Sequence, residues 1–448
     1  MAQARSTSRR SGSPATGINT SPLFVLSCFA LCVRNLPTIL CPSTASRPPV
    51  METASFYPAW TSLSDSIVAV CTLRRGIFAS PAGRRAVPRL MGFADVRERY
   101  GAMFPRAMRM SESAFDTLVD TLRPHLPTHA YSPAMKTAMA LRYMGGGSYI
   151  DIAAVFGCSV ASFYNSLWSV VDAINAVPAL KFSLPLGDPI WRMHTAAGFQ
   201  ARGEGPFDNI IGALDGIAVK QEQPSVSSGQ CLADHYSRKG FYALNTQAIC
   251  NASYEFTWMS CTSPGSVHDA SAFANTKLGR RLMFPSVGDR AIMEMIADGY
   301  CIAADEAYGA SELLATPWPG GGGGDVWRDS YNFHQSSSRI HIEQAFGMLV
   351  WRWGVFWRPL RVPFCKRPSL IRACFKLHNF CRRVDCDGEP APGPYGGDGD
   401  AAGIYFSEND APDRRGRRRD RERSDLRVRM TARMETLGLR RPYTPAMY

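Results

Sequence analysis

The sequence lacks the features by which secreted and zinc-binding proteins are usually recognised. Its 13 cysteines are scattered without a repeated spacing, and no C-x-x-C pair occurs among them. An odd number of cysteines in 448 residues argues against a secreted disulfide framework and favours reduced, mostly buried thiols. The nearest approach to a ligand cluster is Cys374, His378 and Cys381, which share one helical face in "CFKLHNFCRR". Three soft ligands without a clear fourth favour helix packing over zinc.

An apolar run long enough to cross a membrane is also missing. The stretch "LFVLSCFALCV" at 23–33 has eleven residues, too few to span a bilayer as a helix. It has the length of the apolar region of a signal or transit peptide. The cysteine pattern and a basic C-terminal tail favour an intracellular protein, however, and we expect no membrane association. Residues 1–95 are interpreted as a poorly structured leader.

Acidic residues are in deficit. Lysine and arginine outnumber aspartate and glutamate by 50 to 38, which gives a net charge of +12 and a pI near 9.2. This excess favours a polyanionic partner, most often nucleic acid, although a merely basic soluble protein would look the same. With 45% hydrophobic residues and this length, the chain is globular and has room for two or three domains.

Residues 96–185 carry helical patterns. Ser111 is a plausible N-cap of one helix, and a later one ends at glycines 145–147. In "SYIDIAAVFGCSVASFYNSLWSVVDAI", two apolar stripes flank a turn at Gly157, and Ser159 can cap the second helix, as in a helix-turn-helix. A recognition helix would expose Ser162, Tyr164, Asn165 and Ser169, which include no lysine or arginine. DNA contact and simple helix packing therefore both remain open.

Residues 178–206 are rich in proline and glycine and are interpreted as a linker. Strand-like segments follow at 210–219, 243–250, 255–261 and 300–305, with a helical stretch "HDASAFANTKLGRRL" before the last. A long helix is predicted at about 336–357. This order predicts a mixed α/β catalytic domain over residues 200–385. Residues 386–448 read as a flexible basic tail, with nine arginines and four acids at 413–429.

Three carboxylates occupy positions that secondary structure alone does not explain. Asp215 interrupts the apolar run "IIGALDGIAVK", Asp305 ends the fourth strand, and Glu343 lies on the long helix. If the first and fourth strands are neighbours, Asp215 and Asp305 meet, and a crossing helix can add Glu343. Carboxylates about 4 Å apart repel by about 4 kcal/mol at an effective dielectric of 20, so such a cluster calls for Mg²⁺ or Mn²⁺. For Glu343 alone, pairing with Arg339 one turn earlier is the simpler expectation.

Residues from about 100 to 380 resemble the transposases of the PIF/Harbinger superfamily and their domesticated nuclease relatives. Eight blocks that match the family occur in family order: "FPRAMRMSESAFDTL", "IAAVFGCSVASFY", "IIGALDGIAVK", "YSRKGFYALNTQAIC", "SPGSVHDASAF", "IAADEAYG", "YNFHQSSSRIHIEQAFGMLVWRW" and "CFKLHNF". The resemblance implies an RNase H-like fold preceded by an all-α helix-turn-helix region. It also implies an Asp-Asp-Glu triad that uses a divalent metal cation.

The resemblance implies roles for individual residues. Asp215 matches the first acid and Glu343 the last; strand order favours Asp305 as the second, while Asp269 is a fourth candidate ligand or a substitute for it. Phosphate contacts are implied for Arg238, Lys239 and Arg339. His268 beside Asp269 and Asn332 before the final acid lie within blocks that match the family. Asn251 departs from the family pattern, because many relatives have an aspartate at this position.

The sequence therefore predicts a nuclear DDE-type transposase or endonuclease that cleaves and joins DNA. The resemblance implies that the DNA partners are the terminal repeats of a transposon and its target DNA. It also implies a Myb/SANT-like DNA-binding partner protein and leaves a homo-oligomer open. The alternative is a domesticated DNA- or partner-binding protein with weak or no catalysis. A metal hydrolase acting on another substrate is disfavoured by the basic tail and the helix-turn-helix pattern.

Overall fold

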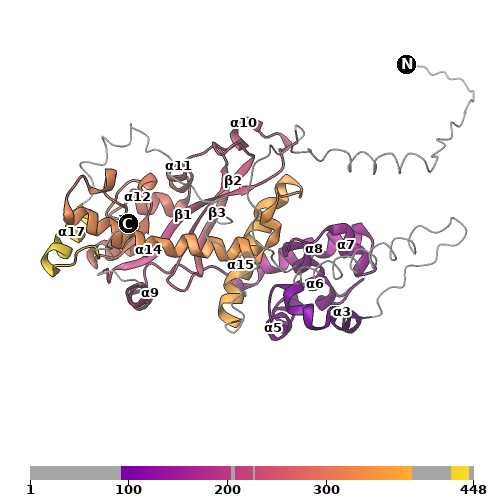
Figure 1. Ribbon diagram of the computed structural model, residues 1–448. Helices are drawn as coiled ribbons and strands as arrows, with labels where there is room; N and C mark the ends of the chain where they lie inside the picture. The colour runs from indigo at the N-terminus through magenta and orange to yellow at the C-terminus, as the bar shows by residue number, and fades with distance from the viewer. Residues whose placement is uncertain (1–91, 203–206, 226–227, 386–424, 443–448) are drawn as a thin grey trace, which may run out of the picture. The chain divides into compact units, whose positions relative to one another are not determined.

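The computed structural model describes residues 92–202, 207–225, 228–385 and 425–442 (Figure 1). Most of the predicted leader and the first part of the predicted tail, residues 1–91 and 386–424, lie outside the described residues.

The helices that precede the sheet are α3 (Phe93–Tyr100), α4 (Phe104–Met108), α5 (Glu112–Leu122), α6 (Pro133–Met144), α7 (Tyr149–Val155), α8 (Val160–Ala176) and α9 (Pro189–Arg202). The strands are β1 (Ile210–Lys220), β2 (Ala243–Cys250), β3 (Phe256–Pro264), β4 (Cys301–Ala304) and β5 (Leu314–Ala315). The later helices are α10 (Leu232–His235), α11 (Asp269–Ala274), α12 (Lys277–Met283), α13 (Arg290–Ala297), α14 (Val326–Arg352), α15 (Arg367–Val384) and α17 (Asp425–Leu437).

The five strands form one mixed sheet in the order β3-β2-β1-β4-β5. β1, β2 and β3 are antiparallel neighbours, whereas β4 runs parallel to β1 and β5 parallel to β4. The mixed α/β prediction is confirmed, and so is the expected pairing of the first and fourth strands. The short strand β5 was not predicted, because two residues carry no periodic signal.

Helices cover both faces of the sheet. On one face α14 crosses β1 and β2, as Figure 1 shows, and its side chains Ile342, Phe346 and Leu349 are buried in the larger apolar core. On the other face Phe273 and Ile292, from α11 and α13, join a second apolar cluster. Apart from Asp215 and its terminal Lys220, β1 is apolar because it packs against helices on both faces.

The helical region follows the capping pattern of the sequence. Ser111 and Ser159 cap α5 and α8 as predicted, accepting hydrogen bonds from Ala114 N and Ser162 N at 3.2 and 3.1 Å. The region shares its core with the sheet, because α8 packs against α15. At that contact Lys376 Nζ donates to the carbonyl oxygen of Asn175 at 2.8 Å.

Two helical segments, α9 and α14, differ from the sequence prediction. The presumed linker 178–206 contains α9, whose Phe199 is buried against the core. The long helix α14 begins at Val326, about ten residues earlier than predicted, because Asp325 accepts hydrogen bonds from Trp327 N and Arg328 N and so starts it directly after the glycine loop.

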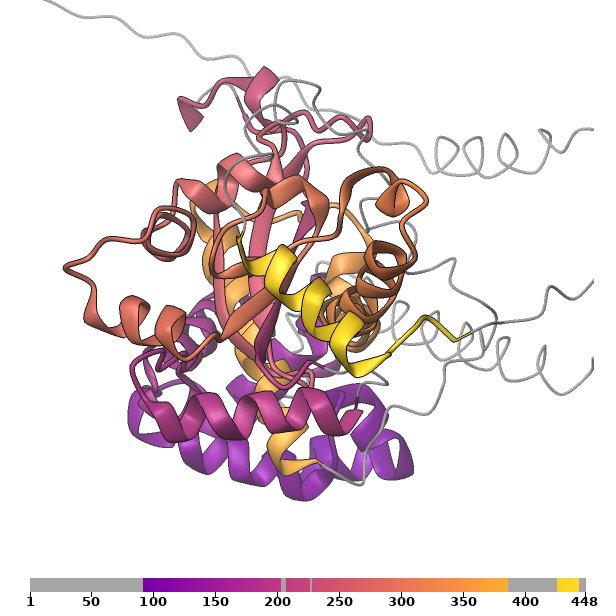
Figure 2. The same ribbon diagram turned by 90° about the vertical axis from the view of Figure 1, so that its left-hand side faces the viewer.

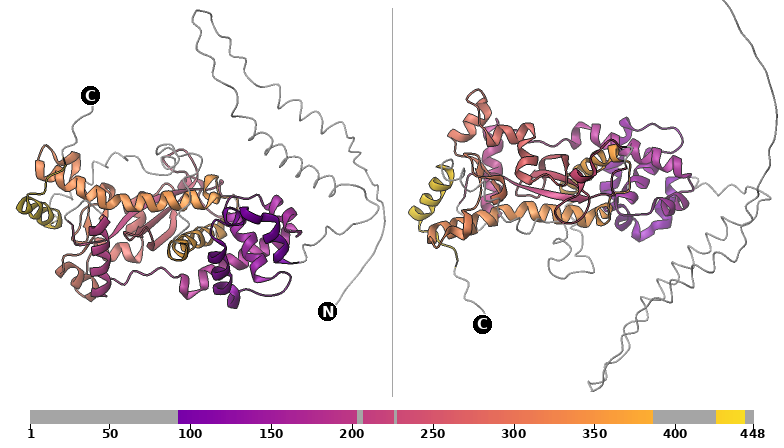
Figure 3. Two further views of the ribbon diagram at one scale, coloured as in Figure 1. Left: turned by 60° about the horizontal axis from the view of Figure 1, so that its bottom comes forward. Right: turned by 90° about the horizontal axis from the view of Figure 1, so that it is seen from above.

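The tail prediction fails for its last part, because residues 425–437 form α17 beside α14 (Figures 2 and 3). Its apolar side chains Leu426, Met430 and Met434 are buried. At the same contact Trp318 Nε1 donates to Thr431 Oγ1 at 3.0 Å, and the guanidinium of Arg427 lies 4.8 Å from the Trp318 ring centroid. This basic segment thus docks through its apolar stripe and through ion pairs of its arginines with acids, such as Arg429 with Glu312 and Arg433 with Asp208.

In the part of the chain that the structure describes, no single helix is long and apolar enough to cross a membrane. The pair α7 and α8 passes that test only when the two are taken together, and they meet at a bend of 102°.

Candidate active site

Two aspartates meet where β1 and β4 run side by side. Asp215 lies in the middle of β1 with 6% of its surface exposed, and Asp305 directly follows β4. The parallel register pairs Leu214 with Ala304, so the next positions along both strands are Asp215 and Asp305. The strand order inferred from the sequence therefore brings these two carboxylates together.

Glu343, on α14, is linked to Asp215 by the side chain of Arg339. Arg339, one helical turn earlier, donates from Nη1 to Glu343 Oε1, and the same nitrogen lies 3.7 Å from Asp215 Oδ2. Only 20% of the Arg339 side chain is exposed. The local pairing expected for Glu343 is therefore present, and it extends to Asp215. Arg339, for which the family resemblance implied a phosphate contact, bridges two acids of the predicted triad.

Asp269, at the start of α11, is held by two amide side chains from β2. Its Oδ1 accepts from Asn245 Nδ2 at 2.8 Å and from Gln247 Nε2 at 2.7 Å. Tyr308 donates from its hydroxyl to Gln247 Oε1 at 2.5 Å, which fixes the amide so that its nitrogen faces Asp269. Asp269 is therefore a rigidly oriented carboxylate, and we call these four residues the Asp269 clamp.

The clamp also explains the glycine that follows Asp215. A Cβ at Gly216 would lie 2.9 Å from Asp269 Cγ and closer still to Asp269 Oδ1 and Gln247 Nε2. Sequence reasoning missed Asn245, Gln247 and Tyr308. A signal was present, because two amides two residues apart in an apolar strand share one face and need buried partners.

The electrostatics of the site reflect crowded negative charge. Burial is the main cause that raises the pKa of Asp215 to about 8; the charges of Asp269 and Asp305 contribute to this rise, while Arg339 and the Gly216 amide oppose it. Burial lowers the pKa of Arg339, but the carboxylates of Glu343, Asp215 and Asp305 outweigh burial and hold that pKa above its usual value. Burial and the same aspartates also raise the pKa of Tyr308. The site holds more negative charge than one guanidinium neutralises.

The other residues that the sequence predicted to contact DNA or to lie near the acids are at the margin of the site or outside it. Arg238 and Lys239 are exposed after α10, and Arg238 Nη2 hydrogen bonds with His268 Nδ1, next to Asp269. Asn332 pairs with the backbone of Trp318, which gives it a structural role.

Asn251 occupies the turn between β2 and β3. Its Oδ1 accepts from the backbone nitrogens of Ser253 and Glu255 at 2.9 and 3.0 Å. The departure from the family pattern at this position is therefore compatible with an intact fold, because an asparagine oxygen makes the turn hydrogen bonds that an aspartate would make.

The predicted recognition helix is α8, which meets α7 at 102°. Asn165 is exposed, whereas Ser162 and Tyr164 are half-buried, and the Tyr164 ring packs against Tyr149 at 5.7 Å between centroids. Of the predicted contact residues, Asn165 is the most accessible.

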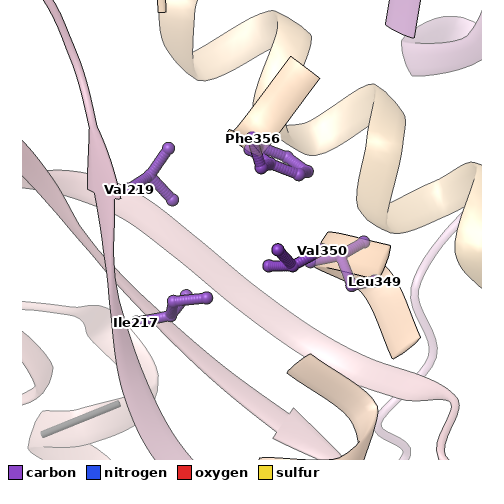
Figure 4. Close-up of a pocket in the computed structure, with 5 residues that line it drawn as sticks. All are labelled: Ile217, Val219, Leu349, Val350 and Phe356. Carbon is purple, nitrogen blue, oxygen red and sulfur yellow. The ribbon is translucent and has the colours of Figure 1, made fainter. Parts of the chain in front are cut away.

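Two other places in the described residues have a structural rather than a functional character. Cys374 and Cys381 are buried on α15, and between them His378 donates from Nε2 to the Tyr254 carbonyl at 2.8 Å, as helix packing requires. A hollow between β1 and the end of α14 is lined only by apolar side chains (Figure 4), namely Ile217, Val219, Leu349, Val350 and Phe356. It offers no donor to a phosphate.

The acids provide the donor chemistry of a hard divalent cation, which prefers carboxylate and amide oxygens. The charges of Asp269 and Asp305, which add to the rise that burial causes in the Asp215 pKa, also favour such a cation. Within the described residues, however, no three His, Cys, Asp or Glu side chains already stand as a ligand cluster. The site fits a cation in chemistry and charge, with Arg339 as the present counter-charge.

Comparison with known families agrees with this geometry. Residues 214–379 match the family model described as DDE superfamily endonuclease, a segment that runs from β1 to α15. The match supports a DDE transposase-like nuclease domain with an RNase H-like fold over this segment. No curated protein and no solved structure gives a significant match.

Proposed function

We propose that this chain is a metal-dependent DNA endonuclease of the transposase type, related to the PIF/Harbinger transposases. The observation that carries the proposal is the convergence of Asp215, Asp305 and Glu343 from β1, β4 and α14 within the segment that matches the endonuclease family. Composition adds support, since a net charge of +12 favours a polyanionic substrate.

In this proposal Asp215, Asp305 and Glu343 would hold Mg²⁺ or Mn²⁺, with Asp269 as a fourth ligand. When bound, a divalent cation supplies the charge that activates water and stabilises the leaving oxygen in phosphodiester cleavage. Asp215 is held by the Gly216 amide at 2.7 Å and by strand pairing on both sides. The Asp269 clamp holds Asp269, so Asp215 and Asp269 would need little rearrangement to bind a cation.

Arg339 has a different part in the proposal. Its guanidinium pairs with Asp215, which is buried, and with Glu343, which is half-buried, and so offsets the repulsion between these two carboxylates. It therefore competes with a cation for the same oxygens. This competition also favours the alternative function, a domesticated chain that binds DNA without cutting it. Nuclear localisation and a Myb/SANT-like partner remain predictions from the family resemblance.

Substitution of Asp215 by asparagine tests the proposal. Asp215→Asn keeps the shape of the side chain but removes its charge, so we expect Mg²⁺-dependent cleavage of DNA with the terminal inverted repeats to disappear while DNA binding persists. Asp120→Asn is the matched control, because Asp120 is exposed and its ion pair with Arg123 contributes little. Equal cleavage by wild type and Asp215→Asn would refute the catalytic role, and binding without cleavage by wild type would favour the domesticated alternative.

A further inference from the structure

Four arginines gather where α4, α6 and α14 end. Arg106 belongs to α4, Arg109 directly follows it, Arg142 lies in the last turn of α6, and Arg352 is the last residue of α14. Arg352 Nη1 donates to the Arg109 carbonyl at 2.7 Å. We call these four residues the arginine cluster.

The cluster carries almost no compensating charge. Arg352 has an ion pair, with Asp385 at 3.6 Å. Among the described residues, no carboxylate lies within ion-pair distance of Arg106, Arg109 or Arg142. Burial lowers the pKa of Arg109, and the positive charges of Arg142, Arg106 and Arg352 lower it further. Four like charges held together beside a single carboxylate, Asp385, indicate a site for an anion that the described residues do not supply.

Arg109 is the most constrained member. Its φ is 64°, in the left-handed region that residues with a Cβ rarely adopt. Its Nη2 donates to the Gly145 carbonyl at 3.1 Å, yet its Nε is buried without a hydrogen-bond partner. The guanidinium lies 5.5 Å from the centroid of the Trp357 ring, and Trp357 is 53% exposed. Strain, an unused buried donor and an exposed aromatic ring thus coincide at one point.

A purely structural explanation accounts for part of this. Arg109 caps the carboxyl end of α6, where a cation is favourable. Capping does not require Arg106 and Arg142 nearby, and it leaves the Arg109 Nε unused. Many arginines elsewhere are paired with an acid, such as Arg123 with Asp120 and Arg290 with Glu294.

We propose that the arginine cluster and Trp357 bind the phosphate backbone of DNA, at a site separate from the acids on β1 and β4. Guanidinium groups form two parallel hydrogen bonds with a phosphate, and an exposed tryptophan beside them packs against a sugar or base. The site adjoins the helix pair α7–α8, because glycines 145–147 join α6 to α7. The choice of DNA rests on the proposed endonuclease function.

The test measures binding rather than cleavage. In the double variant Arg106→Gln/Arg142→Gln, two side chains without carboxylate partners lose their charge, so the fold should persist. Binding to a labelled DNA duplex is followed by fluorescence anisotropy without divalent metal, between about 50 and 200 mM salt. We expect affinity to fall about tenfold or more and the slope of log K against log salt to decrease by about 1.8, the value for two lost phosphate contacts.

Matched variants separate this site from a general loss of charge. Arg123→Gln/Arg290→Gln also removes two charges, from exposed ion-paired arginines, and should leave the slope unchanged. Trp357→Ala should weaken binding severalfold without changing the slope, because it removes no charge. Mn²⁺ affinity should stay at the wild-type value in the Arg106→Gln/Arg142→Gln variant.

The outcomes are distinguishable. If wild type binds DNA and Arg106→Gln/Arg142→Gln binds it equally well with the same slope, the site is refuted while the proposed function stands. If wild type binds no duplex at any salt concentration, both are refuted. A duplex RNA bound more tightly than DNA, with the same loss in the double variant, would overturn the assignment to DNA.

Discussion

The Asp269 clamp makes a sharp prediction for Gly216. Gly216→Ala adds one methyl group that would lie 2.9 Å from Asp269 Cγ and closer to Asp269 Oδ1 and Gln247 Nε2. Asp269 or Gln247 must move, and Gln247 is 1% exposed and already bonded to Tyr308 and Asn245. The perturbation therefore acts on a buried polar network with little room to relax.

The magnitude follows from two costs. Overpacking of a close-packed interior costs about 1–3 kcal/mol. Breaking one buried hydrogen bond in the clamp adds about 1–3 kcal/mol, since a buried donor or acceptor loses its partner. We expect Gly216→Ala to lower the free energy of unfolding by about 2–6 kcal/mol. Displacement of Asp269 should also weaken Mn²⁺ binding, measured by calorimetry on the same samples.

The assay is urea unfolding of wild type, Gly216→Ala and a control, Gly347→Ala. Gly347 lies within α14, and a Cβ there meets no other heavy atom within 4 Å beyond the backbone of its own helix. Because alanine favours a helix over glycine, the control should gain about 0.5–1 kcal/mol. If Gly216→Ala unfolds like wild type and binds Mn²⁺ equally well, the contact between Gly216 and the clamp is wrong.

Two further predictions concern charge. Arg339→Gln removes the guanidinium that pairs with Asp215 and Glu343, so we expect the Mn²⁺ affinity measured by calorimetry to rise about tenfold, or about 1.4 kcal/mol. Arg339→Lys keeps the positive charge and should change the Mn²⁺ affinity less. Weaker Mn²⁺ binding by Arg339→Gln would contradict competition between Arg339 and the cation. Burial lowers the pKa of His378 to about 3, below its ordinary value of 6.5, so neutral His378 stabilises the fold above pH 6.5 and this contribution is lost as the pH falls towards 3. The stability difference between wild type and His378→Gln, from urea unfolding at pH 7.5 and 5, should therefore shrink by about 1.4 kcal/mol per pH unit below 6.5, and a constant difference would show that His378 titrates normally.

The sheet was predictable because its strands are buried on both faces. Apolar runs marked β1 to β4 within a few residues, and their order brought Asp215 beside Asp305. The helices were harder. α9 lies where proline and glycine indicated a linker, and α17 lies where charge indicated a flexible tail. Both helices are stabilised by tertiary contacts, which override the tendency of their composition to form loops. The local sequence does not reveal such contacts.

The site was predictable in its acids but not in its supports. Carboxylates in apolar strands are conspicuous, because burial of an unpaired charge is costly. The partners of Asp269 come from β2 and from the turn after β4, more than 20 residues away on either side, and no spacing rule links them. The bridge from Arg339 to Asp215 depends on how α14 crosses β1, which only three-dimensional packing determines.

The docking of α17 on α14 and of α15 on α8 bears on how the protein can be divided. The endonuclease match ends at residue 379, but the apolar core continues into helices before residue 177 and after residue 425. A fragment cut at the limits of the match would lack α17. The surface that Met430 and Met434 cover would then be exposed to water. For expression and crystallisation, the unit to preserve extends from α3 through α17, and an affinity tag belongs beyond α17 rather than in its place.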